Sequence, residues 1–225
     1  MILLSSANLW FFFILSLNFW LVPLLPQDLA AEVFTDDLLT MTLLAAVAFQ
    51  GIARANFRRW AILTAVVIIA ARLIEEVLPD IRYVENATYA ICFASVAALY
   101  FHTLTTMLDD VTFDTVLAAA CAYILIGMVF TFIFSLVVEF DPKAISSPAD
   151  VTGSPDLLFY SFATLTTLGA SDLVPASHLA RMLTAFEAVI GLIYIATLVG
   201  AVVGSFSARL ASNADAPKDD DLKVE

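Results

Sequence analysis

A short polar segment lies between two long apolar runs and reads Thr164-Leu165-Thr166-Thr167-Leu168-Gly169-Ala170-Ser171-Asp172. Threonine hydroxyls and backbone carbonyls supply oxygen atoms that can take the place of a cation's water shell. Such a lining needs threonine and glycine on extended backbone directly after a short helix. The segment therefore predicts part of a cation path, provided that the surrounding sequence belongs in a membrane.

The composition is that of an integral membrane protein. Of the 225 residues, 61% are hydrophobic and only 14% are charged, whereas soluble domains average about 45–50% apolar residues. A helix needs ~20 residues to cross a bilayer. Six apolar runs are near or above this length, and they cover 8–26, 37–54, 60–78, 84–106, 112–139 and 177–208. The first run has no Lys or Arg and no small-residue cleavage site, so we interpret it as a retained span rather than a secretion signal. We expect an all-α integral membrane protein with six transmembrane helices.

A shorter segment between the fifth and sixth runs is expected to enter the membrane without crossing it. Asp141-Pro142 should end the fifth helix, and Ser154-Pro155-Asp156 is a strong signal for the start of a new one. The twelve or so residues from Pro155 to Thr166 extend only ~18 Å as a helix, which is half a bilayer. Irregular backbone at that depth is tolerated only where protein or water surrounds it. The pattern predicts a re-entrant pore helix and a filter loop, after which Pro175 ends the extended run and Ser177 caps the last helix.

The charged residues indicate the orientation of the chain. Six of the ten basic residues follow the second run or the sixth: Arg54, Arg58, Arg59, Arg209, Lys218 and Lys223. The positive-inside rule makes this side cytoplasmic. Six spans then place both termini in the cytoplasm. We expect the protein to lie in a bacterial inner (plasma) membrane, in contact with membrane lipid. Most acidic residues fall on the outer side, where their field would concentrate cations and repel nucleic acid. Solubility of the outer loops explains any single acid equally well.

Residues 157–169 resemble the pore of bacterial potassium-channel family proteins. The resemblance continues through Asp172, Pro175 and Arg181, and through the Glu-Ala-Val-Ile-Gly sequence of residues 187–191. It implies a filter loop between an outer and an inner helix. A filter with both flanking helices in the right order is a specific signal.

The resemblance covers about residues 110–205. Residues 111–116 and 123–127 resemble the approach to the outer helix in the six-span branch that lacks a voltage sensor. Consistent with this branch, the fourth run, 84–106, contains no Lys or Arg. The first four runs match only in number and spacing. We expect a four-helix transmembrane domain at 1–108, a pore domain at 109–208 and a disordered acidic cytoplasmic tail at 209–225.

The filter departs from the family pattern in its outer half. The family reads Thr-Val-Gly-Tyr-Gly-Asp or Thr-Leu-Gly-Tyr-Gly-Asp, whereas here Gly169 is followed by Ala170, Ser171 and Asp172. Ser171 held at a positive φ would carry a strain of about 1–3 kcal/mol. We therefore expect the inner oxygen rings, from Thr167 and Leu168, to be retained and the outer ones to be rebuilt. Fewer dehydrating rings should separate potassium from sodium poorly.

The resemblance implies a homotetrameric channel for the inorganic cations K⁺ and/or Na⁺, with weakened or lost potassium selectivity, because one loop cannot encircle an ion. The filter would comprise Thr166, Thr167, Leu168, Gly169, Ala170, Ser171 and Asp172, and the cation ligands would be Thr167, Leu168 and Gly169. A potassium-selective channel and a non-conducting membrane partner subunit remain alternatives. A secondary transporter would show paired helix interruptions in two repeats, and this chain shows one. We expect neither an enzyme nor a cofactor other than the permeant ions.

Two residues of the last run are further candidates. Glu187 is an ionisable group at membrane depth, and we interpret it as pore support through a hydrogen bond behind the filter, with a proton sensor as the alternative. Gly191 is a candidate gating hinge or a site of close helix packing. Packing is the preferred interpretation of Gly200 and Gly204.

Overall fold

The computed structural model describes residues 9, 11–13, 15–16, 62–63, 65–67, 69–70, 82–105, 112–147 and 154–214. The elements of this part follow in the order α5 (Arg82–Thr105), α6 (Phe113–Phe140), β1 (Ile145–Ser146), α7 (Ser154–Leu165), β2 (Val174–Pro175) and α8 (His178–Ala214). The described residues at 9–16 and 62–70 are also helical. They belong to the first and third predicted spans, whereas the second span, 37–54, lies outside the described residues.

Local signals set the ends of α6. Thr112 and Thr115 form a reciprocal capping box in which each side chain bonds the other residue's backbone N–H. At the other end, the Asp141 N–H donates to the Val137 carbonyl at 2.9 Å, and Pro142 has no N–H with which to continue the helix. The end predicted for the fifth helix at Asp141-Pro142 is confirmed.

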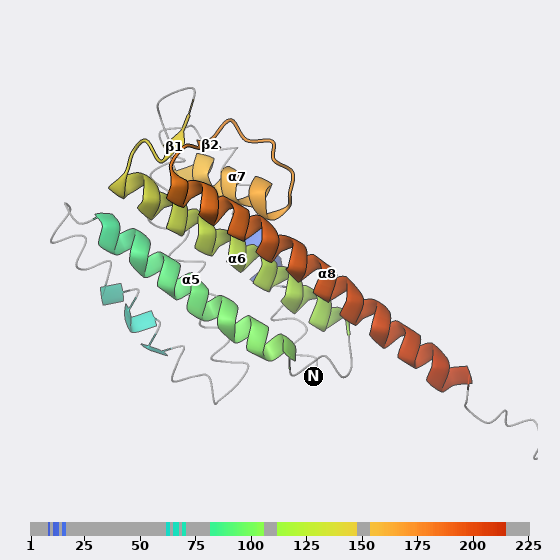
Figure 1. The fold of residues 1–225 in the computed structure, drawn as a ribbon. Coiled ribbons are helices and arrows are strands. Elements are labelled where there is room, and N and C mark those ends of the chain that lie inside the picture. Colours follow the sequence, from blue (N-terminus) through green and yellow to red (C-terminus); the bar gives the residue numbers. More distant parts are fainter. Residues whose placement is uncertain are drawn as a thin grey trace, which may run out of the picture.

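Helices α5, α6 and α8 lie side by side (Figure 1), and neighbours run in opposite directions. The start of α5 meets the end of α6, where the Asn86 amide donates to Glu139 at 3.1 Å. Aromatic stacking of Phe93 on Phe132, with ring centroids 5.5 Å apart, continues this contact. On the other side of α6, the Tyr194 hydroxyl of α8 donates to the Ala119 carbonyl at 2.7 Å.

Buried residues form two clusters along α6. One cluster joins α5, α6, Leu158 of α7 and the helical residues near the N-terminus, including Phe11 and Leu15. The second lies among α6, α7, α8 and the strands, and includes Phe134, Tyr160 and Ala180. Helix α6 contributes several residues to each cluster and contacts α5, α7 and α8, so it is the central helix of the described part.

A two-stranded ribbon ties the start of α8 to the end of α6. β1 and β2 pair antiparallel, with Ile145 opposite Pro175. The Ala144 carbonyl accepts from the N–H groups of Ala176 and Ser177 at 2.8 and 3.1 Å. The Ser177 side chain then accepts from the Ala180 N–H at 3.1 Å, which is the predicted helix cap.

Two described helices are long and apolar enough to cross a membrane, Thr115–Phe140 in α6 and His178–Ser205 in α8. The helix α8 continues to Ala214, beyond the expected end of the pore domain at 208. Residues 209–214 contain no Gly or Pro that would stop it. The rest of the predicted acidic tail lies outside the described residues.

Candidate functional site

The helix α7 lies against both α6 and α8. In the middle of α7, the Tyr160 hydroxyl lies 2.6 Å from the Thr184 hydroxyl of α8. At the end of α7, Leu165 touches Gly191. Residues later in α7 thus contact residues later in α8, so the two helices run in the same direction.

The predicted helix start in Ser154-Pro155-Asp156 is confirmed, since α7 begins at Ser154 and carries Asp156 in its first turn. Its last residue lies beside Gly191, which is 13 residues beyond the start of α8 at His178 (191 − 178), or ~20 Å along that helix. The chain must return from there to β2, which directly precedes α8. Figure 1 shows this loop as the long orange segment that leaves α7 and rejoins the strands.

The carbonyls at the end of α7 are paired within the protein. The Phe162 carbonyl accepts from the N–H and the hydroxyl of Thr166, at 3.0 and 2.6 Å. The Ala163 carbonyl accepts from the Gly169 N–H, and the Thr164 carbonyl accepts from the Thr167 N–H. The Thr167 bond is the 5→2 bond of a Schellman cap, whereas the Ala163 carbonyl accepts from Gly169, one residue beyond the donor that this motif would use.

Residues 167 and 169 have left-handed backbone conformations. Thr167 has φ 58° and Gly169 has φ 65°, and Ser171 is not among the described residues with positive φ. The strain considered for Ser171 is therefore found at Thr167, where a β-branched residue in this region is a genuine outlier. The Ser171 hydroxyl accepts instead from the Leu173 N–H at 3.2 Å, which closes a local turn.

The loop after α7 is largely exposed in the described part of the chain. Residues 166–170 and Asp172 are exposed, and the Leu168 side chain is 64% exposed. Within the described part of the chain, no hydrogen bond is directed at the carbonyls of residues 167–170. These oxygens are therefore available to water, to a cation or to another chain.

Glu187 lies behind α7 and is completely buried. Its Oε1 is 2.5 Å from the Ser161 hydroxyl, which also lies 2.8 Å from the Gly127 carbonyl of α6. The other carboxyl oxygen, Oε2, has no partner among the described residues. Glu187 and Ser161 thus join α8 to the middle of α7, with α6 on the third side.

Glycines allow the close approach of these helices. A Cβ on Gly191 would lie 2.1 Å from the Leu165 carbonyl oxygen, and one on Gly127 would lie 2.5 Å from the Phe162 ring. By contrast, a Cβ on Gly200 or Gly204 would meet nothing within 4 Å. The described part of the chain thus gives a packing reason for Gly191 and shows no close packing around Gly200 or Gly204.

Sequence reasoning assigned no role to Tyr123, whose hydroxyl donates to the Leu165 carbonyl at 3.0 Å. The signal was present, because a tyrosine hydroxyl in an apolar run usually finds a hydrogen-bond partner when buried. The partner could not be read from the sequence, since 42 positions separate the two residues.

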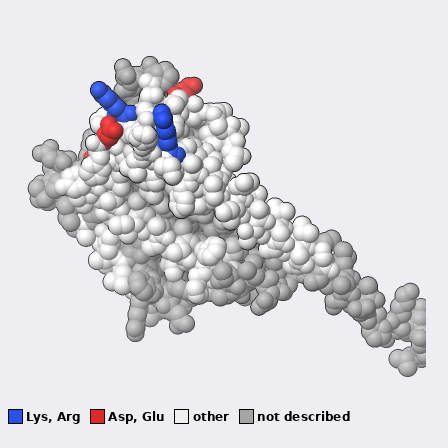
Figure 2. Space-filling view, in the orientation of Figure 1, with Lys and Arg blue, Asp and Glu red and all other residues white. Residues whose placement is uncertain are grey.

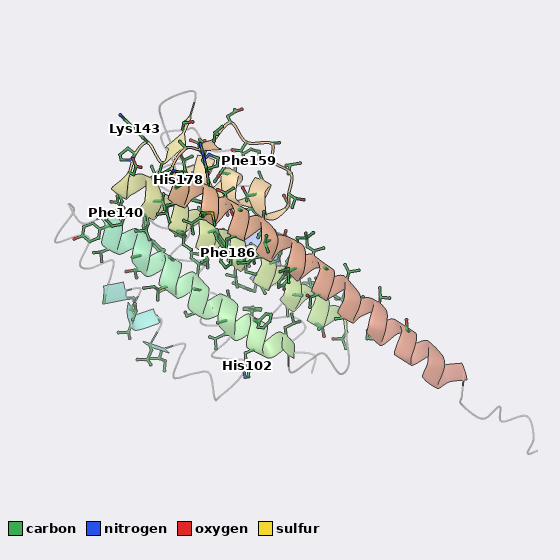
Figure 3. The ribbon with its side chains drawn as sticks, viewed as in Figure 1. His102, Phe140, Lys143, Phe159, His178 and Phe186 are labelled. Atoms are coloured by element: carbon green, nitrogen blue, oxygen red, sulfur yellow. The ribbon has the colours of Figure 1, made fainter. Side chains whose placement is uncertain are left out.

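Charged groups gather at the end of the molecule that carries the strands (Figure 2). The exposed ones include Asp141, Lys143, Asp156, Asp172 and Arg181, which lie near the ends of α6, α7, β2 and α8. Figure 3 places Lys143 and His178 at this end and His102 at the far end of α5. The described α6 and α8 surfaces between these ends are predominantly apolar.

Two comparisons with known proteins point to an ion channel. Residues 146–207 match the sequence model of a family described as ion channel. A protein of Rhodopseudomonas palustris, provisionally named a potassium channel protein, is 42% identical over 53 residues, which are 24% of this chain and 13% of that protein. The match thus spans about an eighth of the relative's length. No solved structure matches the chain.

The matched region contains α7, the loop, β2 and most of α8. The resemblance to bacterial potassium-channel proteins is thereby confirmed. With the two membrane-length helices, the match indicates a membrane protein that carries an ion-channel domain. A match to an ion-channel family model points away from an enzyme.

Proposed function

We propose that this protein is a pore-loop channel for monovalent cations whose narrowest lining is residues 166–172. The match of residues 146–207 to an ion-channel family model and the similarity to a provisionally named potassium channel protein support this proposal. One observation carries the proposal. A twelve-residue helix, α7, advances beside α8 and is followed by a returning loop whose carbonyls at 167–170 have no partner within the described part. In this proposal α7 and the loop form the re-entrant pore element.

The unpaired carbonyls support a water-filled setting for the loop. At membrane depth, each peptide group left unpaired in lipid would cost several kcal/mol. A cation and its remaining water can satisfy several such oxygens at once. The Thr167, Leu168 and Gly169 carbonyls are thus the proposed ligands for K⁺ or Na⁺.

A single loop supplies oxygens from one side only, so we propose a closed assembly of four copies. The surface of α8 supports this step, because only 11% of its apolar membrane-length window is buried within the described protomer. Large exposed side chains on that helix include Met182, Phe186, Val189 and Leu192. Neighbouring copies and lipid would cover them.

The outer half of the loop supports weak potassium selectivity. The residues that replace the family's aromatic and second glycine are Ala170 and Ser171, and the Ser171 hydroxyl is engaged in the turn to Leu173. A turn at this point supplies fewer stacked carbonyls than an extended filter would. Fewer rings leave more water on the ion, and a hydrated ion is recognised less by its size.

The proposal includes the membrane location and the topology of the chain. The channel would lie in a bacterial inner membrane as a multi-pass protein of six spans, with both termini in the cytoplasm. A potassium-selective pore and a non-conducting partner subunit are the competing functions. A measurement of K⁺ and Na⁺ flux distinguishes both of them from the proposed function.

The test uses the full-length protein purified into liposomes. The wild type should pass both K⁺ and Na⁺, and changing Ala170→Tyr together with Ser171→Gly should raise the K⁺/Na⁺ permeability ratio measured from reversal potentials. A gain of about tenfold, equivalent to ~1.4 kcal/mol, is expected for restored outer rings.

The same data identify the alternatives. A wild type that already excludes Na⁺ would favour the potassium-selective channel, and a wild type without flux would favour the partner subunit. An unchanged ratio in the double variant would show that residues 170 and 171 do not form the outer sites.

A further inference from the structure

The last carbonyl of α7 is held from outside its own segment. The carbonyls of residues 162, 163 and 164 accept from N–H groups in the loop that follows, at residues 166, 169 and 167. The Leu165 carbonyl instead accepts from the Tyr123 hydroxyl of α6 at 3.0 Å. Among the described residues, this bond replaces the donor that a helix end lacks.

This carbonyl lies at the junction between α7 and the loop. The Leu165 C=O and the Thr166 N–H share one planar peptide group, so fixing one fixes the other. Thr166 is the first residue of the proposed filter. A rotation of this peptide plane would therefore redirect the carbonyls that follow it.

The helix α8 limits the same carbonyl from another side. A Cβ on Gly191 would be 2.1 Å from the Leu165 oxygen and 3.0 Å from its carbonyl carbon. Both atoms are backbone atoms, so they cannot move aside as a flexible side chain could. Only glycine at position 191 permits α8 to lie this close to the junction.

Tyr123 is itself supported by α8. Its ring lies against the ring of Tyr194, with centroids 5.4 Å apart. The Tyr194 hydroxyl donates to Ala119 in α6 at 2.7 Å. Tyr194 thus makes a hydrogen bond of the same kind, from a tyrosine hydroxyl to a helix carbonyl, but this bond joins α8 to α6 and does not involve α7.

We infer that Tyr123 and Gly191 are positioning residues for the filter, which hold the Leu165 carbonyl and so set the direction in which the backbone leaves α7. The inference rests on the proposed channel function. In this inference, Gly191 allows α8 to pack against the Leu165 carbonyl, and Tyr123 of α6 bonds the same carbonyl. Helices α6 and α8 together then set the backbone geometry at the inner end of the proposed filter.

The test compares Tyr123→Phe with the matched control Tyr194→Phe, in full-length protein reconstituted into liposomes. Each variant keeps its ring and loses one hydroxyl. The Ala119 carbonyl retains its place in the helical ladder of α6, whereas the Leu165 carbonyl loses its described partner. Tyr123→Phe should change the K⁺/Na⁺ permeability ratio about fivefold, which corresponds to ~1 kcal/mol. Tyr194→Phe should leave the ratio at the wild-type value.

Thermal unfolding of both variants separates positioning from general stability. If Tyr123→Phe lowers the midpoint as Tyr194→Phe does but keeps the permeability ratio, the hydroxyl is merely structural and this inference is overturned while the channel stands. If the wild type passes no ions, the proposed function fails and the inference fails with it. A changed ratio in Tyr123→Phe alone would establish the positioning role.

Discussion

Ser161 is the residue on which the buried acid of α8 depends. Its hydroxyl lies within hydrogen-bonding distance of both Glu187 and the Gly127 carbonyl, and that carbonyl also accepts from Thr131 at 2.9 Å. Glu187 has no second partner among the described residues. Removal of the serine hydroxyl therefore leaves the Glu187 carboxyl without its described partner, whereas the Gly127 carbonyl keeps its bond from Thr131. A buried polar group without a partner bears its full desolvation cost.

A double-mutant cycle measures this dependence. We expect Ser161→Ala to lower the free energy of unfolding by about 1–3 kcal/mol in the wild type. In a Glu187→Met background, which keeps the volume and removes the acid, the same change should cost at least ~1 kcal/mol less. Unfolding of the purified protein in detergent provides both values. Equal costs in the two backgrounds would show that the Ser161 and Glu187 side chains do not interact.

The backbone at Thr167 shows where prediction from single residues stops. The altered filter sequence directed attention to Ser171, yet the positive φ values occur at Thr167 and Gly169. The reason is that the conformation follows from the helix cap: the Thr167 N–H bonds to Thr164, and this places the next turn of backbone in the left-handed region. The position of the cap depends on where α7 ends, and sequence signals place helix ends only within a few residues.

At the scale of elements, the starts and stops were predictable because they depend on neighbouring residues. The Asp141-Pro142 break, the Ser154 start and the Ser177 cap all act over one helical turn. What the sequence could not supply was the partner of each helix. The contacts from Tyr123 to Leu165 and from Ser161 to Glu187 join residues 42 and 26 positions apart. They depend on the packing of α6, α7 and α8 around one another.

Two glycines of α8 provide a test of that packing. Gly191→Ala should lower the free energy of unfolding by about 1–3 kcal/mol, because the new methyl group overlaps the Leu165 carbonyl. Gly200→Ala is the control, since its methyl group meets nothing within 4 Å and alanine favours a helix by up to ~1 kcal/mol. Thermal unfolding in detergent compares the two variants.

The outcome also distinguishes the two interpretations of Gly191. A hinge would tolerate alanine in the folded protein and lose only its bending, so stability would stay near that of Gly200→Ala. If Gly191→Ala is no less stable than its control, the close approach of α8 to Leu165 is wrong.

For the whole molecule, the composition predicted a membrane protein, and one motif with its flanking helices predicted an ion-channel region. The family match covers that same region, residues 146–207. The arrangement of copies has no signal in one chain, because the apolar surface of α8 suits lipid and a neighbouring copy alike. The proposed assembly of four therefore follows from the one-sided loop, in which the carbonyls of residues 167–170 need facing oxygens to surround an ion.

Ion flux through Thr167→Cys protein in liposomes, before and after addition of silver ions, tests the lining of the path most directly. The native Cys92 and Cys121 are both buried, so wild-type flux should be unaffected, and Phe159→Cys on the exposed face of α7 supplies a second control. Silver should abolish flux in Thr167→Cys alone, because a metal bound to a thiolate would close the narrowest point. Flux that continues unchanged through silver-treated Thr167→Cys protein would contradict the placement of residues 166–172 around the ions.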